Sequence, residues 1–316
     1  MIRQTCVRTS AMAYYLGIDG GGTKTRCVLA DETTVLAKAM SGGSNIVRLG
    51  EGQARGSLHS AIRQACATAK ISPDRIHAIC IGAAGAARPE IAAKIRNILA
   101  ELISETALPR IEVVGDTEIA LEAAFGAGPG VIVIAGTGSV AYGRDAAGRT
   151  ARAGGWGFAV SDEGSGHWIG RRAISAILSA RDQSRKTALT DMVLQAWKLT
   201  SIDELVQQAN STPAPDFPRL FAIVLRAAAE ADSIARDLLS DAATKLAELA
   251  AIVVRRLAPH APDVVLPVAM TGSVFRQSPH VRQVFYNTLE TSFPGIDVRQ
   301  DPVDPVEGAL ARARRK

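Results

Sequence analysis

Two glycine-rich bends, one in each half of the chain, constrain the fold more than any other feature. The first is Asp19–Thr25 (DGGGTKT), between two short apolar strands predicted at 14–18 and 26–29. The second is Ala135–Ser139 (AGTGS), which also lies between two predicted strands. This pattern predicts a hairpin in each half and indicates an internal duplication.

The chemistry of the first bend suits a polyphosphate. Glycines let the backbone approach phosphate oxygens, and N–H groups and threonine hydroxyls then act as donors. The nucleotide-binding candidates are Asp19, Gly21, Gly22, Thr23 and Lys24. Asp19 can hold Mg²⁺ through water, because Mg²⁺ keeps most of its hydration shell. The bend lacks Walker A spacing and dinucleotide-binding spacing, which excludes both of those phosphate cradles.

A single glycine-rich bend also has a plainer interpretation. A tight type I′ turn requires glycine too, so one such bend does not distinguish a turn from a phosphate loop. Two bends, one in each half and each after an apolar strand, favour two phosphate loops that bind one nucleotide across an interdomain cleft.

The remaining pattern predicts an α/β chain of two domains. Its 316 residues exceed the roughly 250 at which single cores stop growing. In the N-terminal half we predict helices at 52–70 and 90–103, strands at 76–81 and 111–114, and a loop at 42–45. A glycine and proline cluster at 127–130 marks the junction. In the C-terminal half we predict strands at 131–135, 140–143 and 264–270, and helices at 167–180, 191–197, 202–209, 217–258 and 306–314.

Composition excludes several classes of protein. No apolar run approaches the roughly 20 residues that a membrane span needs, and residues 1–11 lack the apolar stretch of a secretory signal. The net charge of +5 lies largely at the chain ends and aromatic residues make up 4%, which argues against nucleic acid binding. Four scattered cysteines give no metal or disulfide motif and indicate a cytoplasmic protein.

Asp116 is the candidate for acid–base chemistry. It follows the predicted strand 111–114 and precedes an alanine-rich helix. A carboxylate at that strand end can accept the proton of a substrate hydroxyl as its oxygen attacks the γ-phosphate of ATP. Aspartate is also a favoured helix N-cap, and the following Thr117 and Glu118 fit that role. Position alone leaves both roles open.

A glycine-tryptophan loop, Gly154–Gly157, precedes the acidic stretch Ser161–Gly166. An aromatic surface and carboxylate acceptors suit a polyhydroxylated ring. In the alternative interpretation, Ser161 or Asp162 caps the following helix and Trp156 fills a domain seam.

Two further features, a turn near the last predicted strand and a histidine, give weaker indications of function. Thr271–Ser273 (TGS) follows the last predicted strand and either receives the adenosine part of a nucleotide or forms a plain strand-to-helix turn. His167 is interpreted as an ordinary helix residue, because no second metal ligand stands at helical spacing beside it.

In their order, these motifs resemble the N-acetylglucosamine kinase and BadF/BadG/BcrA/BcrD ATPase family of the actin/hexokinase/Hsp70 superfamily. The resemblance runs from about Met12 to the C-terminus, and it includes Ser44-Asn45-Ile46. It implies an α/β fold of two actin/ribonuclease H-like domains with an interdomain nucleotide cleft. The implied parts are an extension at 1–11, a domain at 12–128 onto which a C-terminal helix at 303–316 can pack back, and a domain at 129–316 with a helical insertion.

The resemblance also implies a function and its residues. The expected reaction is Mg²⁺- and ATP-dependent phosphorylation of an amino sugar, N-acetylglucosamine or glucosamine, at its 6-hydroxyl by a cytoplasmic homodimer. Asp116 is the expected catalytic base. The residues expected at ATP are Thr23, Thr137, Gly138, Gly272 and Ser273, and those at the sugar are Asn45, Asp116, Ser139, Gly155, Trp156, Gly157 and Asp162. Ala153 stands where the animal N-acetylglucosamine kinases have cysteine, so a contact through that side chain is not expected.

Two other functions compete. An ATPase activator of a dehydratase or reductase holds an iron–sulfur cluster through cysteines, but no motif pairs Cys27 with Cys80. A sugar-sensing regulator usually carries an added helix-turn-helix, and the eleven residues before Met12 are too few to form one.

Overall fold

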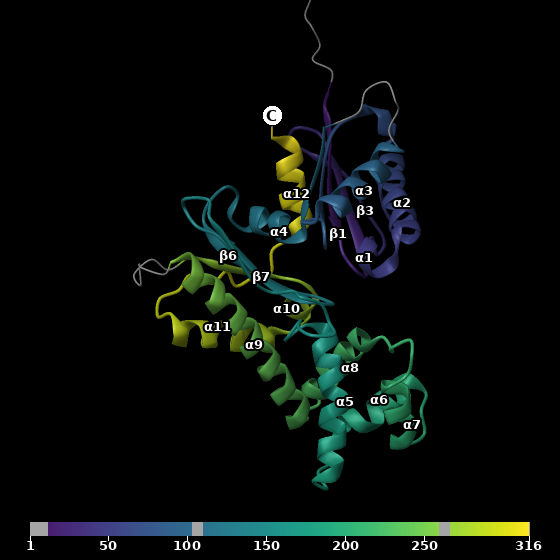
Figure 1. Ribbon diagram of the computed structural model, residues 1–316, viewed down its shortest axis with the longest axis vertical. Coiled ribbons are helices and arrows are strands. Elements are labelled where there is room, and N and C mark those ends of the chain that lie inside the picture. The colour runs from purple at the N-terminus through teal and green to yellow at the C-terminus, as the bar shows by residue number, and fades with distance from the viewer. Residues whose placement is uncertain (1–11, 103–109, 259–265, 316) are drawn as a thin grey trace, which may run out of the picture. The chain divides into compact units, whose positions relative to one another are not determined.

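The computed structural model describes residues 12–102, 110–258 and 266–315 (Figure 1). Its contacts divide the chain into two compact units. Unit 1 comprises Met1–Ala123 and Pro305–Lys316, and unit 2 comprises Ala124–Asp304. Within the described residues, no helix is both long and apolar enough to cross a membrane.

Unit 1 contains a five-stranded sheet of order β3-β2-β1-β4-β5. Its strands are β1 (Tyr14–Gly20), β2 (Lys24–Ala30), β3 (Val35–Gly42), β4 (Ile76–Ala83) and β5 (Arg110–Gly115). β1 pairs antiparallel with β2, which confirms the predicted hairpin, and parallel with β4. β3 was not predicted because it is an edge strand in which Ala37 alone is buried.

Helices cover both faces of this sheet (Figure 1). They are α1 (Ile46–Leu49), α2 (Glu51–Ala69), α3 (Pro89–Ala100), α4 (Asp116–Phe125) and α12 (Pro305–Arg314). α2 and α3 pack on one face of the sheet and form a hydrophobic core with it, and α4 and α12 pack on the other face. The helix predicted at 90–103 ends at Ala100 instead, because no glycine or proline marks its end and the apolar periodicity continues past it; residue 103 lies outside the described residues.

Two glycines let α12 pack closely in unit 1. A Cβ atom at Gly17 of β1 would lie 2.5 Å from the backbone nitrogen of Leu310. A Cβ atom at Gly308 of α12 would lie 2.0 Å from the carbonyl oxygen of Ile119 in α4. The C-terminal helix is therefore part of the core of unit 1, although the whole of unit 2, Ala124–Asp304, separates it from the rest in sequence.

Unit 2 contains a four-stranded sheet of order β8-β7-β6-β9. Its strands are β6 (Gly130–Ala135), β7 (Ser139–Arg144), β8 (Thr150–Gly154) and β9 (Val268–Thr271). Three antiparallel strands followed by a parallel one repeat the order of β3, β2, β1 and β4, which supports the internal duplication. β8 was not predicted, and the strand predicted at 264–270 begins at Val268; residues 264 and 265 lie outside the described residues.

The helices of unit 2 are α5 (Gly166–Asp182), α6 (Ala188–Trp197), α7 (Ile202–Ala209), α8 (Leu220–Ala229), α9 (Ser233–Leu257), α10 (Ser273–Gln277) and α11 (Pro279–Ser292). α9 packs on β7 and β8 and also contacts α11. α5, α6 and α8 pack together (Figure 1), and Leu205 of α7 belongs to the same hydrophobic core. The hydrophobic core runs from the sheet into these helices.

The single helix predicted at 217–258 is wrong, because a cap interrupts it. Ala231 has φ of 67°, and the Asp232 carboxylate accepts from the backbone N–H of Ala235 at 2.9 Å. The same carboxylate accepts from the N–H of Ala188 at 2.7 Å and the hydroxyl of Thr187 at 2.8 Å. Asp232 thus caps α9 and also fixes the start of α6.

We expect Asp232→Ala to lower the free energy of unfolding by about 1–2 kcal/mol, the usual cost of losing a cap. Burial raises the pKa of Asp232, but its hydrogen bonds lower it further, so the net pKa lies below its usual value. This contribution is present above about pH 4 and is lost as the pH falls through the lowered pKa. Urea unfolding at pH 7 and at acid pH measures both effects. Exposed Asp237 of the same helix is the control, and an equal loss in Asp237→Ala would contradict the capping role.

Candidate functional site

Unit 1 gathers its predicted site residues at one edge of its sheet. β1, β4 and β5 are parallel, and their carboxyl ends meet where Asp19 pairs with Gly82 and Ala83 pairs with Gly115. Asp116 follows directly. Ligands of open α/β sheets bind outside the carboxyl ends of the strands, so this edge is the candidate site of unit 1.

The first bend is not a type I′ turn. Its backbone closes with the N–H of Gly21 donating to the carbonyl of Lys24 at 3.0 Å, yet none of Gly20, Gly21 and Gly22 has a positive φ. The glycines of this bend are better explained by close packing than by a turn that requires positive φ. A Cβ atom at Gly20 would lie 2.8 Å from Oγ of Ser44, and the N–H of Ser44 donates to Gly21 at 3.0 Å. The bend therefore sits against the segment that leads into Asn45.

Asn45 lies beside this bend as the N-cap of α1. Its Oδ1 atom accepts from the backbone N–H groups of Val47 at 3.0 Å and Arg48 at 3.2 Å. Two buried hydroxyls hold the preceding turn, since Thr25 Oγ1 donates to the carbonyl of Gly42 and meets Ser44 Oγ, both at 2.8 Å. The Asn45 oxygen thus fixes the loop, and its Nδ2 group is the part of the side chain suited to a ligand.

Asp19 has a cationic neighbour in the adjacent strand. Nη2 of Arg26 donates to Oδ2 of Asp19 at 3.3 Å, and both side chains are largely buried. A partly buried carboxylate is a hard oxygen donor of the kind that Mg²⁺ takes, directly or through water. The residue present therefore fits the predicted metal role.

Two acidic side chains contact the backbone at the start of α4. Asp116 is the first residue of α4, and its Oδ1 accepts from the adjacent N–H of Thr117 at 3.0 Å. The reach-back contact of a capping box comes from Glu118, whose Oε1 accepts from Gly115 N–H at 3.1 Å. Glu118 thus contributes to the capping of α4, and the role of Asp116 as a base stays a prediction.

In unit 2, the second bend is docked on the start of α5. The N–H of Gly166 donates to the carbonyl of Gly136 at 2.8 Å, and the N–H of His167 donates to that of Thr137 at 3.3 Å. The hydroxyl of Ser139 donates to the carbonyl of Glu163 at 2.7 Å. These three bonds hold the bend rigidly.

Asp162 is buried against the same bend. It is 7% exposed with φ of 69°, and a Cβ atom at Gly138 would lie 2.8 Å from its Oδ2. Burial raises its pKa, and hydrogen bonds from the backbone N–H groups of Ser139 and Gly157 oppose that rise. The interpretation of Ser161 or Asp162 as a helix cap is wrong, because Ser165 caps α5 by accepting from Trp168 N–H at 3.1 Å.

Glycine is required around Trp156. Gly154, Gly155 and Gly157 have φ of 72°, 71° and 102°, a region that L side chains rarely adopt. The Trp156 ring is 71% exposed, with the guanidinium of Arg152 5.2 Å from its centre. Arg152 also donates to the carbonyl of Gly155. The loop thus presents an aromatic face that is supported from one side by a cation.

His167 lies between two aromatic rings. Its ring centroid is 4.8 Å from that of Phe158 and 5.4 Å from that of Phe217. It therefore packs in α5 against an aromatic ring on each of two neighbouring segments.

The turn at 271–273 lies against the strand that leads into the second bend. Gly272 has φ of 105°, and a Cβ atom there would lie 2.1 Å from the carbonyl oxygen of Ala135. The buried Thr271 hydroxyl donates to the carbonyl of Val303 at 2.7 Å. β6 and β9 are parallel, so this turn and the second bend share one edge of the sheet.

Each unit therefore brings its own predicted residues together. Unit 1 gathers Asp19, the first bend, Asn45 and Asp116, and unit 2 gathers the second bend, the tryptophan loop, Asp162 and Gly272. Sequence reasoning missed Arg152, because a cation in a strand edge gives no signal of its aromatic partner. It also missed the role of Ser44, although its position beside Asn45 could have indicated it.

The BadF/BadG/BcrA/BcrD ATPase family matches the chain over residues 16–312. The chain belongs to this family. The predicted resemblance is confirmed, and so is the fold class, α/β with two actin/ribonuclease H-like domains.

Named relatives of this family member are amino-sugar kinases. An N-acetylmuramic acid/N-acetylglucosamine kinase of Clostridium acetobutylicum is 34% identical to this chain. The alignment covers 96% of this chain and 99% of that kinase. A glucosamine kinase of Vibrio cholerae is 32% identical, and the alignment covers 74% of this chain and 78% of that kinase. The crystal structure of a putative N-acetylglucosamine kinase from Chromobacterium violaceum is 30% identical, covers 95% of this chain and 98% of that chain, and has a TM-score of 0.71.

The cysteines of this family member do not form a cluster site within the described residues. Cys27, Cys66 and Cys80 are free and buried, and Cys6 lies outside the described residues. Burial raises the pKa of all three thiols, that of Cys80 to about 12. No group of three or more His, Cys, Asp or Glu side chains in the described part of the chain is arranged to hold a metal. The donor set that an iron–sulfur activator needs is therefore not found there.

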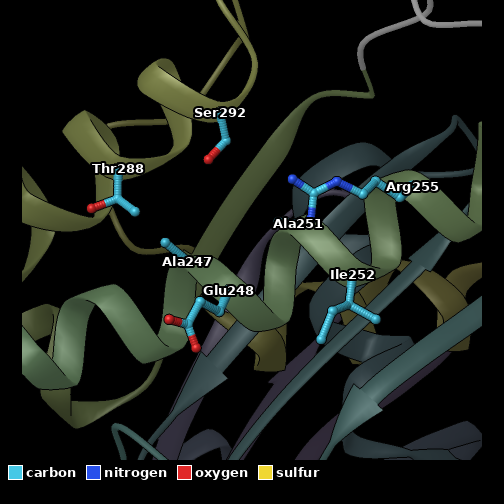
Figure 2. A pocket seen from close by; sticks show the side chains of 7 residues that line it. All are labelled: Ala247, Glu248, Ala251, Ile252, Arg255, Thr288 and Ser292. Carbon is cyan, nitrogen blue, oxygen red and sulfur yellow. The ribbon is translucent and has the colours of Figure 1, made fainter.

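A separate pocket of about 310 Å³ lies between α9 and α11 (Figure 2). Figure 2 shows Thr288 and Ser292 of α11 facing the side chains of α9. Its lining consists of Ala247, Glu248, Ala251, Ile252, Arg255, Thr288 and Ser292. None of these belongs to either group of candidate site residues.

Proposed function

We propose that this family member is an ATP-dependent kinase that phosphorylates an amino sugar, N-acetylglucosamine or glucosamine, at its 6-hydroxyl. The observation that carries the proposal is the edge of the unit 1 sheet, where Asp116, Asp19 and the Asn45 loop come together. The names of the relatives support the substrate class.

Asp116 is the proposed catalytic base. Phosphoryl transfer needs a group that orients the attacking hydroxyl and accepts its proton. A carboxylate at the carboxyl end of β5 suits that role. Asn45 would donate from Nδ2 to a sugar hydroxyl or acyl oxygen, while its own oxygen keeps the loop in place.

The two bends would bind the nucleotide. In unit 1 the backbone of Gly21 and Gly22 and the side chains of Thr23 and Lys24 would donate to phosphate oxygens. A bound Mg²⁺ supplies charge neutralisation on the phosphates, and Asp19 is the residue that would hold it. In unit 2 Thr137 and Gly138 would contact phosphate, and Gly272 and Ser273 the adenosine.

The tryptophan loop would bind the sugar. The exposed side chain of Trp156 offers a flat surface for the apolar face of a pyranose, and the backbones of Gly155 and Gly157 would lie beside its ring. The Ser139 hydroxyl is already donating to Glu163, so it would act toward the sugar as an acceptor.

We expect Trp156→Ala to raise the KM for the sugar about 10-fold, since loss of one stacked ring costs about 1.4 kcal/mol. The KM for ATP should change less than about twofold. Trp156→Phe keeps an aromatic face and serves as the matched control. Steady-state kinetics with each substrate varied in turn measures both constants, and an unchanged sugar KM in Trp156→Ala would remove the loop from the sugar site.

The proposal is tested with a coupled assay of ADP release. Mg·ATP is presented with glucosamine, N-acetylglucosamine, N-acetylmuramic acid, N-acetylmannosamine and glucose, each against a control without sugar. The proposal expects strong turnover with an amino sugar and little ADP release without one. Hydrolysis of ATP that does not depend on sugar would point instead to an ATPase activator.

The proposal also includes a homodimer, which follows from the family resemblance, and a cytoplasmic location, which the scattered cysteines indicate. Light scattering coupled to size exclusion measures the mass of the particle. A mass near 33 kDa, that of one chain, would contradict the dimer.

A further inference from the structure

The aromatic ring of the tryptophan loop is exposed, yet it has a charged neighbour over one face. The side chains of Trp156, Phe158 and Val160 are 71%, 53% and 79% exposed, so the loop buries little apolar surface. A segment of this kind is held by few restraints and changes conformation at low free-energy cost. The guanidinium of Arg152 lies over the Trp156 ring, 5.2 Å from its centroid. This contact can hold the ring in one orientation at a position where packing does not.

The backbone of Arg152 is fixed on two sides. Arg152 lies in the edge strand β8, where it pairs with Tyr142 of β7. Its carbonyl accepts from Nη1 of Arg256 in α9 at 2.7 Å. The strand ends at Gly154, where a Cβ atom would lie 3.1 Å from the side chain of Leu249 in the same helix. The arginine therefore projects from a segment that the sheet and α9 hold together.

The side chain of Arg152 folds back over the loop that follows its own strand. Its Nη2 atom donates to the carbonyl of Gly155. A Cβ atom at Gly155 would lie 2.6 Å from the same Nη2 atom, so glycine leaves the room that this contact needs. A guanidinium is planar, so it can stack on an aromatic face while its N–H groups donate in its own plane. Arg152 thus joins the loop backbone to the indole ring.

We propose that Arg152 is a positioning residue for sugar binding, which holds the Trp156 ring in one orientation and leaves the face opposite the guanidinium for the sugar. This inference rests on the proposed function, which places the sugar at the tryptophan loop. A ring that is already held loses less freedom when the sugar stacks on it, so the sugar binds more tightly. Arg152 acts through the ring and does not contact the sugar.

A double-mutant cycle with Trp156 tests this indirect action. Arg152→Met keeps an unbranched side chain but removes the charge and the donors. We expect it to raise the KM for N-acetylglucosamine about 3- to 10-fold, because the ring must then be ordered on binding. The kcat and the KM for ATP should stay within about twofold of wild type.

The same change in the Trp156→Ala background should alter the sugar KM by less than about twofold, because no ring is left to hold. If Arg152→Met raises the sugar KM by the same factor in both backgrounds, Arg152 contacts the sugar directly and the proposal is overturned. An unchanged sugar KM in the single variant Arg152→Met would overturn it as well.

Arg149→Met is the matched control for the loss of one positive charge. Arg149 is exposed in the turn before β8, and its Nε donates to Oδ2 of Asp145 at 2.6 Å. Its removal should leave the sugar KM as in wild type. An equal rise in the sugar KM of this variant would assign the effect to net charge and would contradict a role for the ring contact.

A second measurement reports the ring contact without any sugar. Acrylamide quenching of the Trp156 emission is obtained by difference from the matching Trp156→Phe variant. It should increase in Arg152→Met, because one face of the ring is uncovered, and unchanged quenching would overturn the proposal. Failure of the inference remains distinct from failure of the proposed function. A protein that phosphorylates an amino sugar equally well with and without Arg152 contradicts the inference alone, whereas no turnover with any amino sugar contradicts the proposed function.

Discussion

Asp116→Asn is expected to reduce kcat by about 100- to 10,000-fold, the usual range for loss of a general base. The amide cannot accept the proton of the attacking hydroxyl, but it has the same shape and keeps the oxygen that accepts from Thr117 N–H. Binding of the sugar and of an ATP analogue should therefore remain. Steady-state kinetics and calorimetry separate the two effects.

Glu118→Gln is the control for the same helix end. Its side chain makes the reach-back contact to Gly115, and glutamine preserves this in a capping box, so kcat should change little. If Asp116→Asn keeps wild-type turnover, Asp116 is not the base. If both variants lose stability rather than turnover, Asp116 is a structural residue of the α4 N-terminus.

Gly272→Ala is expected to lower the free energy of unfolding by about 2–6 kcal/mol. The φ of 105° is strained for any L side chain, at a cost of about 1–3 kcal/mol. The added Cβ would also lie 2.1 Å from the carbonyl oxygen of Ala135, and this backbone cannot yield without moving β6. Overpacking of this kind costs about 1–3 kcal/mol more. Urea unfolding followed by circular dichroism measures the loss.

Gly295→Ala is the control that separates the cost of backbone strain from the cost of the steric clash at Gly272. Gly295 has φ of 79° but no atom within 4 Å of an added Cβ, so this variant should lose only the part due to φ. Equal losses in the two variants would show that the contact with Ala135 does not matter. Wild-type stability in Gly272→Ala would contradict the turn geometry itself.

Most elements of the fold could be predicted from the sequence because their apolar patterns are strong. The hairpin of β1 and β2 and the helices α2, α5, α7 and α12 follow directly from periodicity. β3 and β8 were missed because edge strands bury few side chains, and their pairing is decided by neighbours far from them in sequence. The break between α8 and α9 was missed because helical periodicity does not show a cap, which Asp232 provides by accepting from the N–H of Ala235.

The candidate site shows the same division. The types and order of the motif residues indicated where polar groups end apolar strands, and each unit does gather them at one sheet edge. What the sequence could not supply is which contacts each side chain already makes. Glu118 makes a reach-back contact to Gly115, Asn45 fixes its own loop, and the Asp162 carboxylate packs against Gly138. Each of these depends on backbone positions, which follow from the fold.

The most direct test of the central claim is identification of the product by phosphorus NMR. Purified protein is incubated with Mg·ATP and the amino sugar that gives most turnover, and the new phosphorus signal is correlated with the sugar protons. The account predicts a phosphomonoester coupled to the two protons on C6, formed in equal amount to ADP. Inorganic phosphate as the only new species, or a phosphate attached elsewhere on the sugar, would contradict it.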